Sequence, residues 1–315
     1  MAHYLVTGGC GFIGSHLCDA LVVRGDQVTV LDNLSTGRRE NLPEGCRLLV
    51  GDATSPAAVA KAMEGGVEGA FHLAAVASVQ RCNEDWRNSH LTNQTAAVTV
   101  FDTARRFGKM PVVYASSAAI YGDTGQGAIA ETARPAPQTA YGVDKLGAEL
   151  HGAVAQRVHG VRTVGLRPFN VYGPRQDPRS PYSGVISIFA DRMARGTGIE
   201  IHGDGHQYRD FVHVSDVVRF FLAAMALRSD DPEVLNVASG TKTSLLELVA
   251  VMGDIMGRRP EVSFGPTRAG DIRYSLGDPS RSAQRLGVLA RMSLQDGLGA
   301  MLGGTSKFEH LVTAR

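Results

Sequence analysis

A glycine-rich turn near the amino terminus constrains the fold more than any other feature of this sequence. Gly8, Gly11 and Gly14 form a GxxGxxG pattern that follows a short apolar, β-rich segment (residues 3–7) and opens a helical pattern (residues 15–24). Glycines at such a junction allow a tight turn and a close approach of the backbone to a ligand. The helix start also offers free N–H groups and a partial positive charge to a pyrophosphate. The pattern therefore predicts a dinucleotide site, with a tight turn that binds nothing as the alternative.

Strand-like and helical segments alternate from the glycine turn to about residue 170. Strands are expected at 27–31, 47–50, 70–73, 112–115 and 162–166, and helices at 56–63, 90–107 and 140–159. This alternation predicts an α/β fold, a Rossmann-like doubly wound parallel sheet with helices on both faces.

The pattern of expected elements changes beyond residue 170, where the loop-like residues 173–181 are followed by shorter helices and strands. Residues 211–227 still read as a strand edge and a helix. We therefore predict a nucleotide-binding domain at 1–168 plus about 211–238, a smaller α+β substrate-binding domain at 169–210 and 239–302, and a loose tail at 303–315.

Composition excludes several classes of protein. With 32 Lys and Arg residues against 31 Asp and Glu residues, the 315-residue chain lacks the positive excess of a nucleic-acid or membrane-surface binder. No apolar run approaches 18 residues, and no cationic region precedes the apolar amino-terminal stretch, so we expect a cytoplasmic protein without a membrane span. The cysteines form no CxxC pair and the histidines no HExxH or HxH cluster, so no metal site is predicted.

An acidic residue ends the second expected strand. Asp32 lies 18 residues beyond Gly14, where a carboxylate can bind a ribose 2′-hydroxyl and repel a 2′-phosphate. This position predicts NAD rather than NADP, although Arg38 and Arg39 nearby could soften the choice, and turn chemistry is the simpler alternative. Asp52 occupies a similar strand end and could reach the adenine.

A tyrosine and a lysine share one helix face. Tyr141 and Lys145 are four residues apart, Thr139 can cap their helix, and Ser117 follows a strand expected to be buried. The pKa of a phenol is near 10, and a neighbouring ammonium together with a nicotinamide cation would bring it toward neutrality. Tyr141 would then act as a general base on a sugar or alcohol hydroxyl, with Ser117 orienting the proton. The alternative is an ordinary surface pair.

Ten motifs occur in order along residues 3–300. They are the three glycines, Asp32, Asp52, residues 72–75 (HLAA), Asn93, residues 116–122 (SSAAIYG), the Tyr141–Lys145 pair, residues 167–174 (RPFNVYGP), residues 209–214 (RDFVHV) and residues 268–271 (RAGD). On these motifs the chain is identified as a member of the extended short-chain dehydrogenases/reductases, and it resembles their nucleotide-sugar epimerases, in particular UDP-glucose 4-epimerases.

The resemblance implies a reaction in which tightly held NAD takes a hydride from C4 of a UDP-sugar and returns it to the opposite face. It implies Ser117, Tyr141 and Lys145 as catalytic residues, with Tyr141 removing the O4 proton. The residues implied for NAD are Gly8, Gly11, Phe12, Ile13, Gly14, Asp32, Asn33, Asp52, Ala53, Leu73, Ala74, Ala75, Asn93, Ser116, Tyr141 and Lys145. Those implied for the UDP-sugar are Ser117, Tyr141, Asn170, Val185, His202, Arg209, Arg268, Asp271 and Ser275. It also implies a homodimer formed through the helices at 90–107 and 140–159.

Three positions bear on the reaction and the sugar. Relatives that eliminate or decarboxylate carry an acidic residue shortly after the Ser or Thr, where this chain has Ala118 and Ala119, which cannot move a proton. Ser275 stands where some UDP-glucose enzymes have a tyrosine, which leaves room for an N-acetyl group. The expected activity is a UDP-hexose 4-epimerase for UDP-glucose, and for UDP-GlcNAc as well.

The alternatives are other functions on the same scaffold. One is a UDP-glucuronate 4-epimerase, with Arg175, Arg179 or Arg273 as the cation for the sugar acid, or another nucleotide-sugar epimerase or reductase of the family. A more remote one is a non-catalytic NAD-binding regulator.

Overall fold

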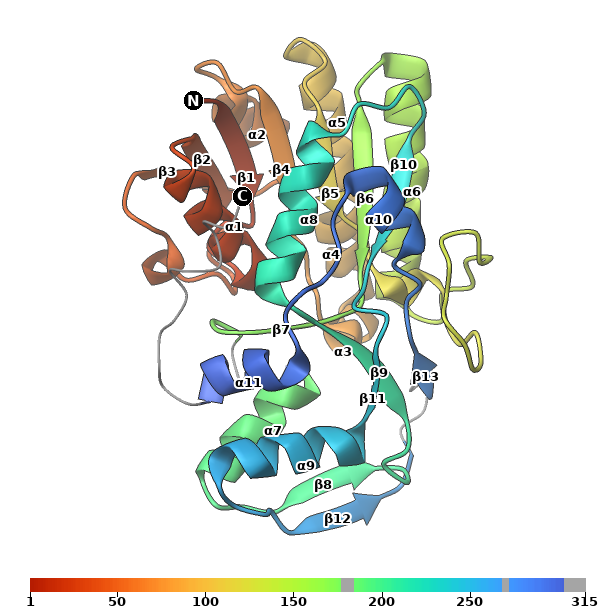
Figure 1. Cartoon of the computed structure of the whole chain (residues 1–315). Helices are drawn as coiled ribbons and strands as arrows, with labels where there is room; N and C mark the ends of the chain where they lie inside the picture. Colours follow the sequence, from red (N-terminus) through yellow and green to blue (C-terminus); the bar gives the residue numbers. More distant parts are fainter. Residues whose placement is uncertain (177–183, 268–271, 303–315) are drawn as a thin grey trace.

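Seven parallel strands form the main sheet of the computed structural model, which describes residues 1–176, 184–267 and 272–302 (Figure 1). In chain order the strands are β1 (His3–Thr7), β2 (Gln27–Asp32), β3 (Cys46–Val50), β4 (Gly69–His72), β5 (Val112–Ala115), β6 (Thr163–Pro168) and β10 (Glu233–Val237). Their spatial order is β10-β6-β5-β4-β1-β2-β3. The order reverses between β1 and β4, and ligands of open α/β sheets bind at the carboxyl ends of the strands at such a point. The predicted Rossmann-like α/β fold is confirmed.

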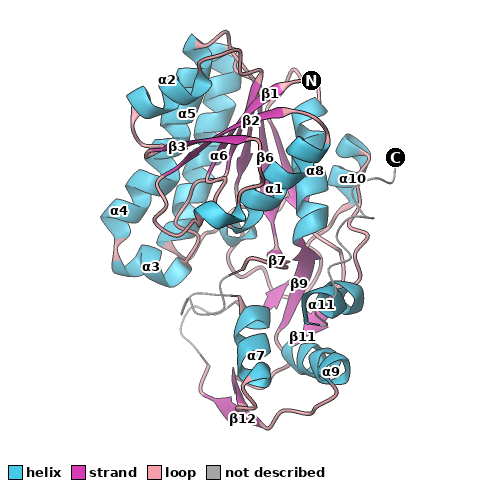
Figure 2. Cartoon of the chain, turned by 90° about the vertical axis from the view of Figure 1, so that its left-hand side faces the viewer, coloured by secondary structure: helices cyan, strands magenta, loops and turns pink. Residues whose placement is uncertain are grey.

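Helices cover both faces of this sheet (Figures 1 and 2). One face carries α1 (Phe12–Val23), α8 (Val214–Ala226) and α10 (Ser280–Leu286), and the other carries α2 (Pro56–Met63), α5 (Ala96–Arg106) and α6 (Ala140–His159). Leu5 and Val6 of β1 are both fully buried, but in different apolar clusters. Successive strand side chains point to opposite faces, so a sheet covered on both sides requires the unbroken apolar strands seen in the sequence.

The predicted helix at 90–107 is part of a longer helical region. It comprises α3 (Val79–Glu84), α4 (Trp86–His90), a π-helical turn η2 (Leu91–Thr95) and α5. The predicted bounds of β1, β5, α2 and α6 are those observed. Helix α1 begins three residues earlier than predicted, because Gly11 already serves as its N-cap.

A smaller part of the chain lies beyond the carboxyl ends of the main strands (Figure 1). It contains a sheet of β7 (Asn170–Tyr172), β9 (Tyr208–His213), β11 (Lys242–Ser244) and β13 (Tyr274–Ser275), a parallel pair of β8 (Ile199–His202) and β12 (Val262–Gly265), and helices α7 (Val185–Ala194), α9 (Leu245–Met256) and α11 (Leu294–Leu302). Phe189, Leu248 and Leu298, one from each helix, share a separate apolar core.

The chain passes between the two parts several times. Strand β9 runs directly into α8, and α10 returns from the smaller part to pack on α8 and β10. The domain bounds predicted from the sequence remain our proposal, and the predicted tail at 303–315 lies outside the described residues. None of the described helices is both long enough and apolar enough to cross a membrane.

Candidate active site

A cleft of about 1670 Å³ runs along the carboxyl ends of the main strands and continues between the sheet and the smaller part. All of the predicted site residues that the structure describes line this cleft, except Asn93. On the nucleotide side these are Gly8, Gly11, Phe12, Ile13, Gly14, Asp32, Asn33, Asp52, Ala53, Leu73, Ala74, Ala75 and Ser116; at the centre Ser117, Tyr141 and Lys145; and beyond them Asn170, Val185, His202, Arg209 and Ser275. Arg268 and Asp271 lie outside the described residues.

The glycine turn is built so that side chains are excluded from it. Gly8 has a φ of 71°, and a Cβ atom there would lie 2.6 Å from the backbone nitrogen of Ala74, which follows β4. A Cβ atom on Gly14 would collide with the carbonyl oxygen of Gly8. Gly11 caps α1 without a side-chain hydrogen bond. This crowded, side-chain-free helix start fits the pyrophosphate of a dinucleotide.

Two carboxylates flank the ribose end predicted for the nucleotide. The buried carboxylate of Asp32 accepts hydrogen bonds from the backbone N–H groups of Cys10 (2.9 Å) and Leu34 (2.8 Å). Asn33 donates to Asp52 across 3.0 Å and so joins the ends of β2 and β3. Because each carboxylate oxygen has two lone pairs, Asp32 keeps acceptor capacity for a ribose hydroxyl.

Asn93 lies in the π-helical turn, not in the cleft. Its Oδ1 accepts from the backbone N–H of Val76 at 2.7 Å, and its Nδ2 donates to the Val76 carbonyl at 3.2 Å. Both ends of the amide are therefore used to fix the loop after β4, which does line the cleft. Asn93 therefore supports one wall of the cleft through this loop, and it does not line the cleft as predicted.

The proposed catalytic groups meet at the centre of the cleft. Thr139 caps α6 by accepting from Gly142 N–H at 3.1 Å, as the sequence predicts. Lys145 Nζ lies 5.7 Å from the ring centroid of Tyr141 and donates to the carbonyl of Ala115 at 2.9 Å. Ser117, just after β5, shares a side-chain hydrogen bond with Tyr141.

The electrostatics of the tyrosine and the lysine are dominated by burial. Burial raises the pKa of Tyr141 to about 12, and the hydrogen bond with Ser117 only partly offsets this. Burial likewise lowers the pKa of Lys145 to about 8. Desolvation disfavours the charged form of both groups and is the largest cause of each shift. A nearby positive charge would lower the pKa of Tyr141 again, because it favours the phenolate.

A buried polar network fixes α6 to the sheet. Glu149, one turn beyond Lys145, forms a two-pronged ion pair with Arg167 of β6 at 2.8 and 2.7 Å, and it also accepts from Ser116. Arg167 in turn donates to the hydroxyl of Tyr121 at 2.8 Å. Glu149 belongs to none of the sequence motifs, although its position four residues after Lys145 places it on the same helix face.

The far end of the cleft carries the residues predicted for the substrate. Ser275 on β13 pairs in register with Arg209 on β9, so the two sit side by side. One guanidinium nitrogen of Arg209 donates to the carbonyl of Tyr208 at 3.0 Å, which steadies the side chain. Arg81 and Arg192 also line the cleft, although neither belongs to a recognised sequence motif.

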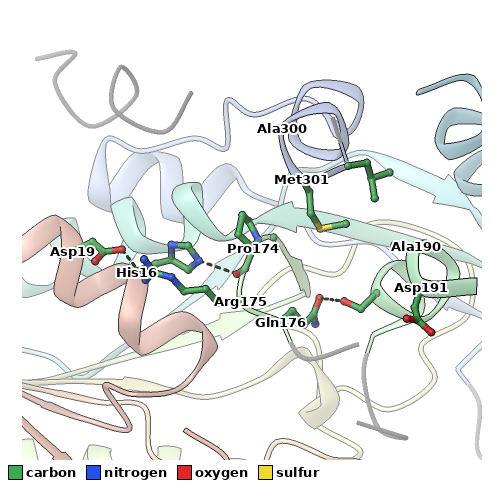
Figure 3. A pocket seen from close by; sticks show the side chains of 12 residues that line it. His16, Asp19, Pro174, Arg175, Gln176, Ala190, Asp191, Ala300 and Met301 are labelled. Atoms are coloured by element: carbon green, nitrogen blue, oxygen red, sulfur yellow. Dashed lines mark hydrogen bonds and ion pairs between the residues drawn. The ribbon is translucent and has the colours of Figure 1, made fainter. Parts of the chain in front are cut away.

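A second cavity, of about 600 Å³, lies between α1, α7, α11 and the loop after β7 (Figure 3). There Arg175 pairs with Asp19 at 2.7 Å, and His16 contacts the carbonyl of Pro174 at 2.9 Å. Arg273 is similarly paired with Asp204, at 2.6 Å. Two of the three arginines considered for an acidic sugar are therefore bound to carboxylates of the chain itself.

The third of these arginines, Arg179, lies outside the described residues. In the described ranges, no three His, Cys, Asp or Glu side chains are grouped so that they could hold a metal ion.

Comparison with known proteins identifies the family. The model of the NAD dependent epimerase/dehydratase family matches residues 4–238. The UDP-glucose 4-epimerase of Thermotoga maritima, solved with UDP-glucose, is 36% identical to this chain with a TM-score of 0.92. The match covers 96% of this chain and 97% of that protein. The UDP-N-acetylglucosamine 4-epimerase of Methanobrevibacter ruminantium, solved with UDP-N-acetylmuramic acid, is 32% identical with a TM-score of 0.91 and the same coverage. MoeE5, solved with UDP-glucuronic acid and NAD, is 33% identical with a TM-score of 0.87. The match covers 96% of this chain and 98% of MoeE5.

Proposed function

The chain belongs to the NAD-dependent epimerase/dehydratase family, and from this premise we propose that it is a UDP-hexose 4-epimerase. It interconverts UDP-glucose and UDP-galactose and also accepts the N-acetylated pair. The observation that carries the proposal is the meeting of Ser117, Tyr141 and Lys145 in one cleft with Ala118 and Ala119 beside them. The cleft thus holds a group that can move the O4 proton and, at these two positions, no group for elimination or decarboxylation.

The nucleotide half of the cleft holds NAD in this proposal. The glycine turn accepts the pyrophosphate, Asp32 the ribose hydroxyls, and Lys145 the nicotinamide ribose. Bound NAD supplies a reversible hydride acceptor and a positive charge that favours the Tyr141 phenolate. Since the hydride is returned, no net oxidation occurs and the cofactor need not leave.

The chain's own groups carry the proton and hold the sugar. As a phenolate, Tyr141 takes the proton from O4 of the hexose, and later returns it, while Ser117 orients the hydroxyl by hydrogen bonding. Arg209 and Arg268 bind the diphosphate through their guanidinium forks, and Asn170, Val185, His202 and Asp271 complete the grip on the nucleotide. Because the diphosphate is held firmly, the 4-keto hexose is free to rotate and present its opposite face.

The sugar specificity depends on Ser275 in this proposal. A small residue beside Arg209 leaves space for a C2 acetamido group. We expect Ser275→Tyr to lower kcat/KM for UDP-GlcNAc by at least about tenfold while UDP-glucose turnover is largely retained, because added bulk in a pocket rejects the larger substrate. Steady-state kinetics with both sugars measure this. Unchanged activity on the acetylated sugar would show that the steric argument is wrong.

A neutral hexose is favoured over the glucuronate alternative. Arg175 and Arg273, two of the arginines considered for an acidic sugar, are paired with Asp19 and Asp204. Arg81 and Arg192 also line the cleft, so the choice between the sugars is decided by the assay. The direct test incubates the purified protein with UDP-glucose, UDP-GlcNAc or UDP-glucuronate without added cofactor and resolves the epimers by NMR. Epimerisation of the neutral sugars is expected. A strict need for stoichiometric NADPH would refute the epimerase proposal.

We further propose that the protein is a homodimer. Helix α6 exposes Val143, Leu150, Val154 and Val158, which are 50%, 63%, 47% and 69% accessible. Their spacing of seven, four and four residues places them in one stripe along the helix. Such a stripe is typical of a surface that is covered by a partner, and a second copy of α5 and α6 would form a four-helix bundle with it.

A further inference from the structure

A carboxylate is buried one helical turn beyond Lys145. Glu149 is 6% exposed and follows Tyr141 and Lys145 at intervals of four residues, so the three share one face of α6. Two nitrogens of Arg167, on β6, meet its carboxylate at 2.8 and 2.7 Å. The hydroxyl of Ser116, directly after β5, donates to the same carboxylate. Glu149 therefore joins the helix that carries Tyr141 to two neighbouring strands of the main sheet.

Stability alone is a weak explanation for a charged pair at this place. Two charges taken out of water lose about as much solvation as their attraction returns, and apolar side chains of similar volume often stabilise equally well. Arg167 also donates to the hydroxyl of Tyr121 at 2.8 Å, and Tyr121 donates to Asn236 at 2.7 Å. A buried network in which the members are hydrogen-bonded to one another rigidifies its surroundings and fixes their positions.

The hydrogen bond between Ser117 and Tyr141 depends on how two elements are aligned. Ser117 is the N-cap of the turn η3 (Ala118–Ile120), where it accepts from the N–H of Ala119 at 3.1 Å. Tyr141 lies in the first turn of α6. The turn positions one hydroxyl and the helix positions the other, so a shift of α6 against η3 would separate them while both elements stay intact.

Contacts spread over more than two helical turns hold α6 against the end of β5 and η3. Near the helix start, a Cβ atom on Gly142 would lie only 2.7 Å from a carbonyl oxygen of η3. One turn on, the Lys145 ammonium donates to the Ala115 carbonyl at 2.9 Å. A further turn on, Glu149 accepts from Ser116. Because these contacts are spread along the helix, together they fix both its position and the direction of its axis.

We propose that Glu149 is a positioning residue that holds α6 so that Tyr141 meets Ser117. The inference rests on the proposed role of these two hydroxyls in moving the O4 proton. Arg167 fixes the carboxylate, and the carboxylate holds the Ser116 hydroxyl, so the helix and the end of β5 stay together. A displacement of about 1 Å in a reacting geometry is enough to lower kcat strongly.

Two double variants that differ only at position 149 test the proposal. Glu149→Gln with Arg167→Met removes both charges but leaves an amide oxygen that accepts from Ser116. Glu149→Met with Arg167→Met removes this acceptor as well. Neither variant leaves a buried charge unpaired, which would be strongly destabilising. Both lose the ion pair equally, so a difference between them reports the bond to Ser116.

The titration of Tyr141 can be followed without measuring activity. The chain contains eight tyrosines, so full-length, NAD-saturated protein with 3-fluorotyrosine gives eight 19F resonances, and Tyr141→Phe identifies the one of interest. A hydrogen bond from Ser117 stabilises the phenolate. Its loss in the Glu149→Met double variant should raise the Tyr141 midpoint by on the order of one pH unit relative to the Glu149→Gln double variant.

The kinetics should follow the titration. We expect kcat for UDP-glucose to be about tenfold to a hundredfold lower in the Glu149→Met double variant than in the Glu149→Gln one. KM should be alike, because the diphosphate is bound elsewhere in the cleft. Ser116→Ala breaks the same bond while the ion pair stays, and it should reproduce the shift and the loss. His151→Gln, at an exposed position of α6, is the control and should change nothing.

The outcomes distinguish this proposal from the proposed function. If both double variants are folded by urea unfolding and share one Tyr141 midpoint and one kcat, the network is only part of the core and the inference is wrong. If they do not fold, Ser116→Ala decides, and a wild-type midpoint there contradicts the inference equally. If the midpoints differ as expected but the wild type epimerises no UDP-sugar, the alignment of Tyr141 with Ser117 stands and the assigned reaction is refuted.

Discussion

At the scale of single residues, the chemistry depends on one phenol and one ammonium. Tyr141→Phe removes only a hydroxyl, and we expect kcat to fall by about 10²–10⁴, the usual contribution of general acid–base catalysis. Binding of UDP should be almost unaffected, because the phenyl ring remains in place against Lys145. Epimerisation rates and equilibrium binding of UDP measure the two effects. Tyr4→Phe is the control, and comparable loss of UDP binding in Tyr141→Phe would contradict a purely chemical role.

The buried lysine has a thermodynamic consequence. Its pKa is about 8 in the folded chain against an ordinary 10.5. Between these values the unfolded chain binds the proton more tightly, so the free energy of unfolding rises as pH increases from about 8 to about 10.5. Lys145→Met should raise the free energy of unfolding at pH 7 by about 3 kcal/mol at most and remove this rise.

Urea unfolding of the NAD-free wild type and Lys145→Met at several pH values between 7 and 10.5 tests this expectation. A stability difference between the two proteins that does not change with pH would show, by linkage, that folding does not lower the pKa of Lys145, and the expectation would be wrong.

At the scale of elements, the junction of β1 and α1 determines whether the nucleotide can approach. In Gly8→Ala the new Cβ atom meets the Ala74 backbone at 2.6 Å, and the φ of 71° adds strain of about 1 kcal/mol. Gly25 after α1 has a similar φ of 84° but nothing within 4 Å of an added Cβ atom. Gly8→Ala should therefore lose NAD affinity by at least about tenfold, whereas Gly25→Ala should lose only stability. NAD titration calorimetry compares them, and equal NAD affinity would contradict the close-approach argument.

At the scale of the whole molecule, the exposed stripe of α6 decides the oligomeric state. Leu150→Glu combined with Val154→Glu would bury two carboxylates per subunit in the proposed interface, which is strongly unfavourable. We expect the wild type to sediment as a dimer and this variant as a monomer with its secondary structure intact. Val23→Glu, at a 65% exposed position on α1, is the control. A wild type that sediments as a monomer at micromolar concentration would refute the dimer.

The sequence alone determined the sheet, the glycine turn and the start of α6. Strand and helix periodicity, the Gly8–Gly14 spacing and the Thr139 cap act over a few residues, so the chain carries them without reference to distant contacts. The same local order placed Ser117, Tyr141 and Lys145 at the ends of neighbouring elements.

Only the tertiary structure decided how these side chains are paired and how they titrate. It turned the Asn93 amide toward Val76, bound Arg175 to Asp19, and placed Asp144 against His90. Burial also raises the pKa of Tyr141 in the protein itself, which the Tyr–Lys spacing alone does not indicate. The physical reason is that desolvation and pairing depend on which atoms surround a group, and those atoms come from segments far apart in the chain.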